Sequence, residues 1–365
     1  MRVLLLNSIL YTPTNNRIPK LASVDNCMIF QVCMEFVKQG HEVTLVAGKE
    51  YEPTTPSTLP IKVLYFRSAM PWLFVPSLLP FHPQLIPYLR KHKNEFDVII
   101  SSDIFSINSF LAATIATDKT ILWNEQGKHN RKFFKIPSLI WYQVVVRLCM
   151  QKVRVTSRSP IAERFALQFG MNVLPVVIDH GIDERIFYAQ CEKEPFFIIS
   201  ARLDAYKNVL SILVQYKRYT ELYPDAPHRL YIAGSDAGEL ERLQAYVVEH
   251  QLEDQVVFLG RVSQTVLADY MRRATCMLCN SLKESNMISI DESIASGTPV
   301  ITNTVPYSYE WIKQYQLGIA KDNWTAEDIH EVVRNNSRYV TNCIAYAPQL
   351  SLSLLPQKFI QLVHS

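Results

Sequence analysis

Glycine and cysteine are used in ways that exclude several kinds of site. The chain of 365 residues has only 10 Gly, so a glycine-rich phosphate loop is less expected than a loop built from other residues. Its 7 Cys show no repeated CxxC spacing and therefore no zinc pattern. We expect reduced thiols in a cytoplasmic compartment. The N-terminal MRVLLLNSIL lacks a small-residue cleavage site, which favours a buried strand over a signal peptide.

Three further motifs are missing. No Asp-x-Asp pair follows an apolar strand-like run, so we expect neither a metal ion nor another cofactor. No GxGxxG follows the first such run, which disfavours a dinucleotide-binding dehydrogenase. Basic residues do not cluster in a recognisable nucleic-acid-binding module, so nucleic acid is not an expected partner.

Charge is unevenly divided along the chain. The 37 Lys+Arg and 34 Asp+Glu give a net charge of +3. Residues 1–190 hold 21 basic and 14 acidic residues, which is +7, whereas residues 191–365 hold 16 and 20, which is −4. A basic first half indicates either an anionic partner or a solvated basic surface.

Residues 68–89 contain no charged side chain, although their length would permit a membrane span. Five prolines, at positions 71, 76, 80, 83 and 87, argue against a regular helix there. We expect an irregular apolar segment around Trp72, Leu73 and Phe74. It is either a loop packed on the core or a patch that faces an acceptor or a membrane.

Residues 128–152 interleave basic and aromatic side chains. These side chains are Lys128, Arg131, Lys132, Phe133, Phe134, Lys135, Trp141 and Tyr142. Basic residues are attracted to an anionic leaflet, so the run predicts peripheral contact with an anionic membrane that weakens with salt. A helix at 137–150 is predicted, either as an ordinary buried helix or as one that meets the membrane.

Apolar runs alternate with helical patterns twice along the chain. In the first half, strand-like runs at 2–8, 41–48, 98–102, 120–125 and 153–157 alternate with patterns such as 27–40, where Gly40 is a plausible helix C-cap. The pattern restarts after residue 190, with strands at 196–203, 228–234, 256–260, 276–281 and 298–303. This order predicts an α/β protein with two doubly wound Rossmann-like domains, whose ligands bind at the carboxyl ends of the strands.

Five short sequence elements stand in a fixed order between residues 178 and 303. They read IDHGIDERIF (178–187), RLDAYKN (202–208), FLGRV (258–262), Glu284 and Glu292 separated by seven residues, and IASGTPVITN (294–303). Arg202 and Lys207 lie just after a predicted strand and are cations that suit an anionic group. Met287, Ile288 and Ser289 precede the predicted helix at 290–297, and amides at a helix N-terminus suit a phosphate.

Together these elements resemble the C-terminal domain of retaining GT-B glycosyltransferases, family 4 in particular (glycosyl transferases group 1). The resemblance implies two Rossmann-like domains facing a central cleft: residues 1–188 for the acceptor, 189–345 for the nucleotide-sugar, and a tail at 346–365 that packs back on the first domain. It implies that Arg202 and Lys207 neutralise the departing diphosphate, and that the start of the predicted helix at 290–297 also binds the donor. It also implies that Glu292 binds the ribose, Val262 lies by the nucleobase and Glu284 contacts the sugar.

The sequence departs from the family pattern in three places. The Gly-Gly of the loop after the first strand falls near Ala22 and Ser23, in a loop that also holds Asn15, Asn16 and Arg17. Ser285 stands where Gly is usual. The N-domain His is replaced by Glu125, with His129 four residues on. We expect Glu125 to act on the donor sugar, with His129 in that role as the alternative, Glu125 then pairing with a cation such as Lys128.

The resemblance implies transfer of a hexose or N-acetylhexosamine, with a UDP-sugar favoured, to a glycan or lipid-linked acceptor in cell-surface polysaccharide synthesis. The expected location is cytoplasmic, peripheral on the inner face of the membrane. Two alternatives stay open: a nucleotide-sugar epimerase of GT-B-like fold, and a catalytically inactive sugar-binding module.

Overall fold

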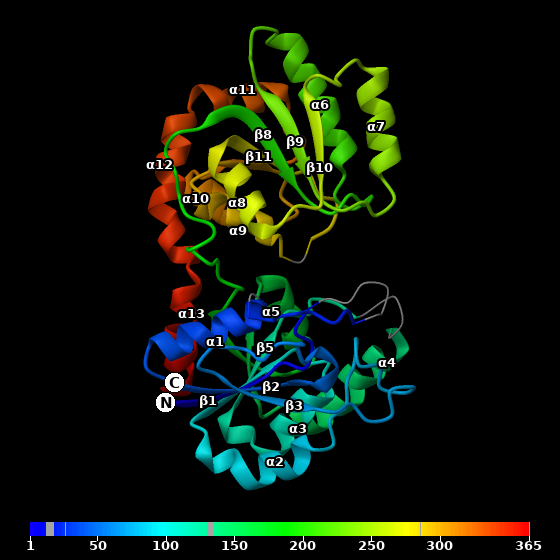
Figure 1. The fold of residues 1–365 in the computed structure, drawn as a ribbon, viewed down its shortest axis with the longest axis vertical. Helices are drawn as coiled ribbons and strands as arrows, with labels where there is room; N and C mark the ends of the chain where they lie inside the picture. The colour runs from blue at the N-terminus through cyan, green and yellow to red at the C-terminus, as the bar shows by residue number, and fades with distance from the viewer. Residues whose placement is uncertain (12–17, 26, 130–134, 285, 365) are drawn as a thin grey trace. The chain divides into compact units, whose positions relative to one another are not determined.

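The computed structural model describes residues 1–11, 18–25, 27–129, 135–284 and 286–364. The predictions for Asn15, Asn16, Arg17, residues 131–134 and Ser285 lie outside the described residues. The chain divides into two compact units: unit 1 is Met1–His180 with Ser353–Ser365, and unit 2 is Gly181–Leu352. Figure 1 shows the two units with their helices and strands.

Unit 1 is built on a parallel sheet that has seven strands among the described residues. In spatial order these are β3 (Lys62–Phe66), β2 (Glu42–Gly48), β1 (Arg2–Leu6), β4 (Val98–Ser102), β5 (Thr120–Asn124), β6 (Arg154–Ser157) and β7 (Asn172–Val177). The helices are α1 (Met28–Lys38), α2 (Leu85–His92), α3 (Ile107–Ile115), α4 (Lys135–Ile140), which continues as the π-helix η4 (Trp141–Met150), α5 (Pro160–Leu167) and α13 (Leu355–His364). Short 3₁₀ turns lie at Lys49–Tyr51, Lys93–Glu95 and Thr117–Lys119.

Unit 2 repeats the same winding with a sheet that has six strands among the described residues. Their order is β10 (Val256–Gly260), β9 (Arg229–Ala233), β8 (Glu194–Ser200), β11 (Ala274–Leu278), β12 (Val300–Thr302) and β13 (Gly318–Ala320). The helices are α6 (Val209–Leu222), α7 (Leu240–Glu249), α8 (Gln264–Arg273), α9 (Ile288–Ala295), α10 (Tyr309–Tyr315), α11 (Ala326–Arg334) and α12 (Asn336–Tyr346), followed by 3₁₀ turns at Ala347–Leu350 and Leu352–Leu354. In both units the first strand is central and the chain then winds outward in two directions, which is the doubly wound arrangement predicted from the sequence.

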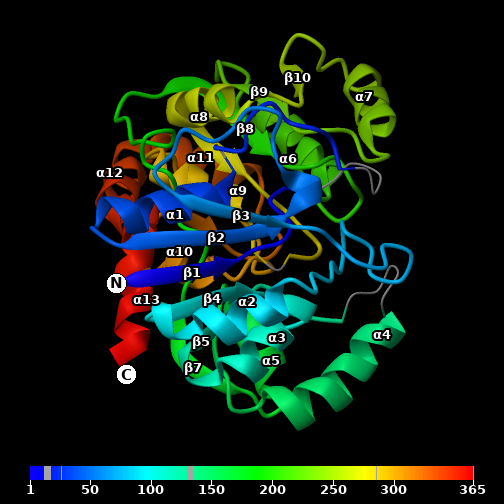
Figure 2. The ribbon, with the colours of Figure 1, turned by 60° about the horizontal axis from the view of Figure 1, so that its bottom comes forward.

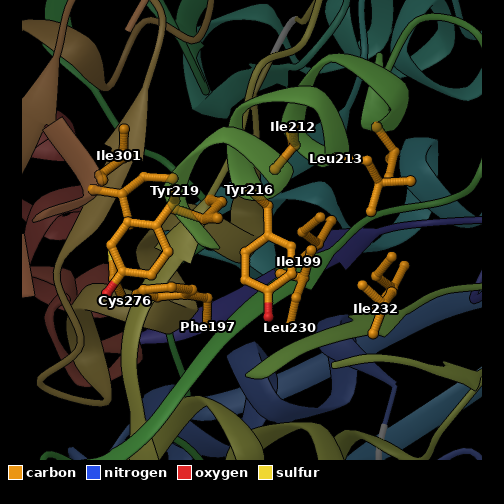
Figure 3. Packing of buried hydrophobic residues seen from close by; sticks show 14 of the residues in the cluster. Phe197, Ile199, Ile212, Leu213, Tyr216, Tyr219, Leu230, Ile232, Cys276 and Ile301 are labelled. Carbon is orange, nitrogen blue, oxygen red and sulfur yellow. The ribbon is translucent and has the colours of Figure 1, made fainter. Parts of the chain in front are cut away.

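The inner strands of unit 2 are largely apolar and buried, as expected where helices cover both faces of a parallel sheet. Along β8, Phe197 and Ile199 point into one core and Phe196 and Ile198 into the other. Figure 3 shows the first core, where Tyr216 and Tyr219 of α6 pack among the aliphatic side chains of the strands. Tyr216 is completely buried and keeps its hydroxyl satisfied by donating to the carbonyl of His228 at 2.8 Å.

The chain returns to unit 1 at its C-terminal end. Figures 1 and 2 show α13 beside α1. Phe359 of α13 packs edge-on against Trp123 with ring centres 5.4 Å apart, and Arg154 on β6 donates to the carbonyl of Leu362 at 2.7 Å. The structure thus divides the chain at 180/181 and again at 352/353, where the sequence analysis had placed boundaries at 188/189 and 345/346.

Two local expectations have clear outcomes. Gly40 follows α1 with φ of +81°, and its N–H donates to the carbonyl of Val37, so the predicted glycine stop is confirmed. The expectation that 68–89 excludes a regular helix was wrong at its end, because α2 begins at Leu85 and contains Pro87. Pro87 lies in the first turn of the helix, where backbone N–H groups have no intrahelical acceptor and proline therefore costs no hydrogen bond.

Candidate active site

Parallel strands place all their carboxyl ends at one edge of a sheet, which is where open α/β sheets bind ligands. In unit 1, four neighbouring strands each deliver a polar residue to that edge. Asp103 follows β4, Glu125 follows β5, Arg158 follows β6 and His180 lies just beyond β7. The sequence analysis singled out only Glu125 among them.

Glu125 is held by the residues that follow the next two strands. Its Oε2 accepts a hydrogen bond from Arg158 Nη1 at 3.1 Å and lies 3.5 Å from His180 Nε2. Burial by itself would raise the pKa of Glu125, but the neighbouring His180 and Arg158 outweigh it and lower the pKa to about 2. Glu125 is therefore ionised at any physiological pH, while its side chain stays half exposed.

Arg158 is the buried cation of this cluster. Its guanidinium lies 3.8 Å above the ring of Trp123, and its Nη1 is also 2.9 Å from His180 Nε2. Arg158 thus lies within hydrogen-bond distance of both Glu125 and His180, and its guanidinium, which can only donate hydrogen bonds, places a buried positive charge beside the Glu125 carboxylate.

Asp103 fixes the backbone on which Glu125 stands. Its Oδ1 accepts from the Glu125 N–H at 2.9 Å, and its own N–H donates to the Trp123 carbonyl at 3.1 Å. Asp103 adopts a left-handed φ of +62°, which costs a non-glycine residue free energy and often marks a functional loop. Burial raises the pKa of Asp103.

His129, the alternative to Glu125, lies in an aromatic cluster. Its ring meets those of Tyr142, Phe165 and Phe169 edge-on, with centres 5.4, 5.2 and 5.8 Å apart, and its Nδ1 lies 3.1 Å from Ser138 Oγ. Burial lowers the pKa of His129, so the imidazole is neutral near pH 7. The described neighbours of the His129 ring are thus mainly aromatic, whereas those of Glu125 are polar and charged.

Ser23 lies on the exposed part of the loop before α1. Its Oγ accepts from the Asp25 N–H at 3.1 Å, a local turn contact. The neighbouring Ala22 carbonyl accepts from the Thr55 N–H at 3.0 Å. The loop around Ser23 is therefore held by a side-chain turn contact and by a backbone hydrogen bond from Thr55.

In unit 2, the loop after β8 carries both cations predicted to face a diphosphate. Asp204 organises this loop: its Oδ1 accepts from the backbone N–H groups of Tyr206 and Lys207 at 3.0 and 3.2 Å. Its Oδ2 accepts from Arg202 Nε at 2.9 Å, and the Arg202 side chain remains largely exposed. The arrangement presents Arg202 to solvent at the edge of the sheet.

Lys207 and Glu284, predicted from separate motifs, form an ion pair with each other. Their side chains are only 19% and 8% exposed. They meet because β8 and β11 are neighbours in the sheet, and the backbone N–H of Leu282 donates to the Tyr206 carbonyl at 2.8 Å to join the two loops. The structure thus brings a phosphate-binding candidate and a sugar-binding candidate into one site.

Helix α9 begins beside this pair. Met287 is the buried N-cap residue of α9, and its side chain makes no hydrogen bond to the helix amides. The backbone N–H groups of the first turn, including those of Ile288 and Ser289, therefore have no acceptor in this side chain and suit another acceptor. Glu292 lies one turn further along. Burial raises its pKa to about 7, and a hydrogen bond with Gln264 of α8 opposes the rise.

Val262 stands after β10, half-buried, next to Gly260, whose φ is +63°. Ser263 then caps α8, accepting from the Val266 N–H at 3.3 Å. Val262 is therefore at the same edge of the sheet as Arg202, separated from it by β9. Within the described part of the chain, no group of three or more His, Cys, Asp or Glu side chains is placed to hold a metal ion.

The missed residues of unit 1 left a weak signal in the sequence. Arg158 directly follows the predicted strand at 153–157, and His180 belongs to the quoted segment IDHGIDERIF. Inspecting the residue after every predicted strand would have selected Arg158, whereas His180 lies beyond β7 (Asn172–Val177), a strand that the sequence analysis did not identify.

The chain was compared with protein families and with known proteins. Residues 183–347, which lie within unit 2, match the family model described as Glycosyl transferases group 1. The chain is 28% identical over 147 residues to the O-antigen chain mannosyltransferase RfbU of Salmonella typhimurium. That match covers 40% of this chain and 40% of the relative, so it spans less than half the length of either protein.

Solved structures match the whole chain. A glycosyltransferase from Rickettsia africae superposes with a TM-score of 0.69 at 14% identity, covering 99% of this chain and 97% of the other. Anabaena HepE in complex with UDP-glucose gives a TM-score of 0.64 at 16% identity, covering 100% and 99%. At these identities the likeness establishes the fold, which is that of the GT-B glycosyltransferases: two Rossmann-like units with parallel sheets.

Proposed function

We propose that the protein is a retaining glycosyltransferase of family 4 that moves a hexose or N-acetylhexosamine from a nucleotide-sugar, with UDP-sugars favoured. The observation that carries the proposal is the edge of the unit 2 sheet. There Lys207, Glu284 and the start of α9 converge in the domain that matches Glycosyl transferases group 1. The UDP-glucose complex of the structural neighbour HepE supports the choice of donor.

The residues of unit 2 would share the donor as follows. Arg202, Lys207 and the N-terminal amides of α9 neutralise the diphosphate as it leaves, because cations and helix N-termini both stabilise negative charge. Glu292 accepts hydrogen bonds from the ribose hydroxyls, and the backbone at Val262 lies by the nucleobase. Glu284 contacts the transferred sugar and, through its ion pair, also orients Lys207.

Glu125 is the contribution of unit 1 in this proposal. Its carboxylate is ionised and oriented by Arg158, so it can accept a hydrogen bond from a sugar hydroxyl or stabilise positive charge developing at the anomeric carbon. It cannot donate a hydrogen bond, which an imidazole could. We place Glu125 rather than His129 in this role because His129 is packed among aromatic rings.

The acceptor in this proposal is a glycan or a lipid-linked glycan of cell-surface polysaccharide synthesis, reached from the cytoplasmic side of the membrane. The name of the relative RfbU, an O-antigen chain mannosyltransferase, supports this class of acceptor. Contact with an anionic membrane would bring the enzyme to such an acceptor.

The test begins with the donor. UDP-, GDP- and ADP-sugars are screened by thermal shift, since a ligand that binds only the folded state raises the melting temperature. Nucleotide release is then measured with and without lipid-linked acceptors, and the anomeric configuration of the product is read by NMR. Acceptor-dependent release with retention supports the proposal. Release or epimerisation that ignores the acceptor indicates an epimerase, and binding without any turnover indicates an inactive sugar-binding module.

A further inference from the structure

Four successive residues between β11 and Glu284 are each hydrogen-bonded to a different neighbour. We call these residues, Cys279 to Leu282, the β11 segment. The four bonds join the Cys279 carbonyl to Trp324 Nε1 at 3.0 Å, Asn280 Nδ2 to Ser211 Oγ at 2.8 Å, the Ser281 carbonyl to Asn303 Nδ2 at 2.7 Å, and the Leu282 N–H to the Tyr206 carbonyl at 2.8 Å. The backbone that leads to Glu284 is therefore fixed from several sides.

Asn303 connects the β11 segment to the next loop of the sheet. It follows β12 directly, and its side chain is buried. Its Nδ2 donates to the Ser281 carbonyl, and its Oδ1 accepts a longer hydrogen bond from the Val305 N–H at 3.4 Å. An amide can do both because it carries a donor and an acceptor, whereas an aliphatic side chain can do neither. The loops after β11 and β12 are therefore joined through this side chain.

The position of Glu284 matters because its carboxylate pairs with Lys207 in a poorly exposed site. The two partners stand on different loops. Asp204 Oδ1 accepts from the Lys207 N–H at 3.2 Å, whereas Glu284 stands three residues after Ser281. A buried ion pair stabilises a protein only when its geometry is good, because the desolvation of both charges opposes it. A small shift of the Ser281 carbonyl would therefore weaken the pair without removing either charge.

We propose that Asn303 is a positioning residue that holds Glu284 against Lys207. It acts through the Ser281 carbonyl and the backbone that follows, and it contacts no part of the donor in the proposed function. The competing explanation is that its amide stabilises only the turn at 303–305. The effect of Asn303 on the ion pair is independent of any activity, whereas its effect on donor binding rests on the proposed function.

The test is a double-mutant cycle on the full chain. It compares the wild type, Asn303→Leu, Lys207→Met and the variant that carries both substitutions. Leu is close to Asn in shape, has no donor and adds no charge. Unfolding in urea is followed by hydrogen exchange of peptides from unit 2, so that unit 1 does not obscure the result. Lys207→Met should lower the folding equilibrium constant roughly tenfold less when Asn303 is already replaced, because the ion pair that it removes is then already weakened.

Asn336→Leu is the matched control. Asn336 Nδ2 donates to the Thr275 carbonyl at 2.7 Å, which is the same kind of bond at the same distance, but near the start of β11 instead of after its end. Its cost should add to that of Lys207→Met without coupling, because the two sites share no partner. Asn303→Ser keeps a shorter donor and should show a smaller coupling of the same sign. This milder variant decides the question if Asn303→Leu does not fold.

Binding of UDP, measured by thermal shift, gives a second readout. Asn303→Leu should weaken UDP binding roughly tenfold in the wild-type background and much less in the Lys207→Met background. A residue that stabilises only its own turn would show no such dependence on Lys207. If the wild type binds no UDP, the proposed donor is wrong, and the unfolding cycle still decides the role of Asn303.

Two results would overturn the proposal. The costs of Asn303→Leu and Lys207→Met add in full, or Asn336→Leu couples to Lys207→Met as strongly as Asn303→Leu does. The first result would assign the amide of Asn303 to its own turn. The second would show that the coupling is a general response of unit 2 to the loss of a hydrogen bond to β11.

Discussion

The two units present opposite kinds of charge at the carboxyl edges of nearly identical windings. In unit 1 the buried group is a cation, Arg158, and the group open to solvent is the carboxylate of Glu125. In unit 2 the better-buried partner is the carboxylate of Glu284, and the cation Arg202 extends into solvent. A common fold therefore carries opposite charge arrangements in its two units, because the residues after the strands, not the strands, set the chemistry. In the proposed function, the first arrangement would serve developing positive charge and the second departing negative charge.

The largest effect is expected from breaking the buried pair of unit 2. Lys207→Met leaves Glu284 without its cation in a site where the carboxylate is only 8% exposed. Removing one partner of a buried ion pair typically costs about 3–5 kcal/mol, so thermal or urea unfolding should show a loss near the lower end of that range. Donor affinity should fall as well. Lys217→Met, in an exposed pair with Glu221, is the control and should change stability little.

The corresponding test in unit 1 is Glu125→Gln, which keeps an oxygen for Arg158 and removes the charge. If Glu125 stabilises the transition state, kcat should fall roughly 10²–10³-fold, as for the loss of one preorganised electrostatic group, with donor affinity nearly unchanged. His129→Ala should mainly loosen the aromatic cluster and lower the melting temperature. Wild-type turnover in Glu125→Gln combined with a collapse in His129→Ala would reverse the assignment.

A smaller effect is expected at the ribose end of the donor site. Glu292→Ala should weaken donor binding by about 1.5–3 kcal/mol for each hydrogen bond lost to the carboxylate. Isothermal titration with the donor identified by thermal shift measures this directly. An unchanged dissociation constant would show that the ribose is bound elsewhere.

The same residue predicts a pH dependence that unit 1 should lack. The pKa of Glu292 is raised to about 7 in the folded protein, so protons begin to occupy it as the pH falls through 7. Ribose hydroxyls donate to the ionised form, and donor affinity should therefore decrease by about tenfold from pH 8 to pH 6. Glu125, with a pKa of about 2, stays ionised over this range and contributes no such dependence. The Glu292→Gln variant should give a flat profile, and an equally steep profile in that variant would refute the assignment.

The last prediction is that removing metal ions has no effect on activity. Cationic side chains and helix amides carry the diphosphate in this proposal, so activity should survive excess EDTA. Loss of activity that Mn²⁺ or Mg²⁺ restores would show that a metal ion replaces part of the cationic contribution.

The two-domain α/β fold could be predicted from the sequence because most strands are apolar runs that end in polar residues. Sequence reasoning also selected Lys207 and Glu284 as candidates, since each lies in a short motif of the sequence. It did not find that they pair, nor that Arg158 and His180 surround Glu125. Those contacts join residues 22–77 positions apart, and they exist only because the sheet order makes the corresponding strands neighbours.

The edge strands were the weakest part of the prediction. Of the four edge strands among the described residues, β3, β7 and β13 were not singled out, whereas β10 was predicted at 256–260. The helix at Leu85–His92 was not predicted for a different reason. Its proline lies in the first turn, where a helix tolerates one.

The packing of α13 on unit 1 has a consequence for how the protein can be dissected. Phe359 lies against Trp123 and Phe36, and Leu362 receives a hydrogen bond from Arg154, so unit 1 is encoded in two pieces separated by the whole of unit 2. During synthesis the first 180 residues would emerge with part of their core still open, until the last turns of the chain arrive to cover it. A recombinant unit 1 that ends at His180 would expose these aromatic side chains. One that fuses residues 353–365 to His180 through a short flexible linker restores the missing helix and should be the soluble form of the domain.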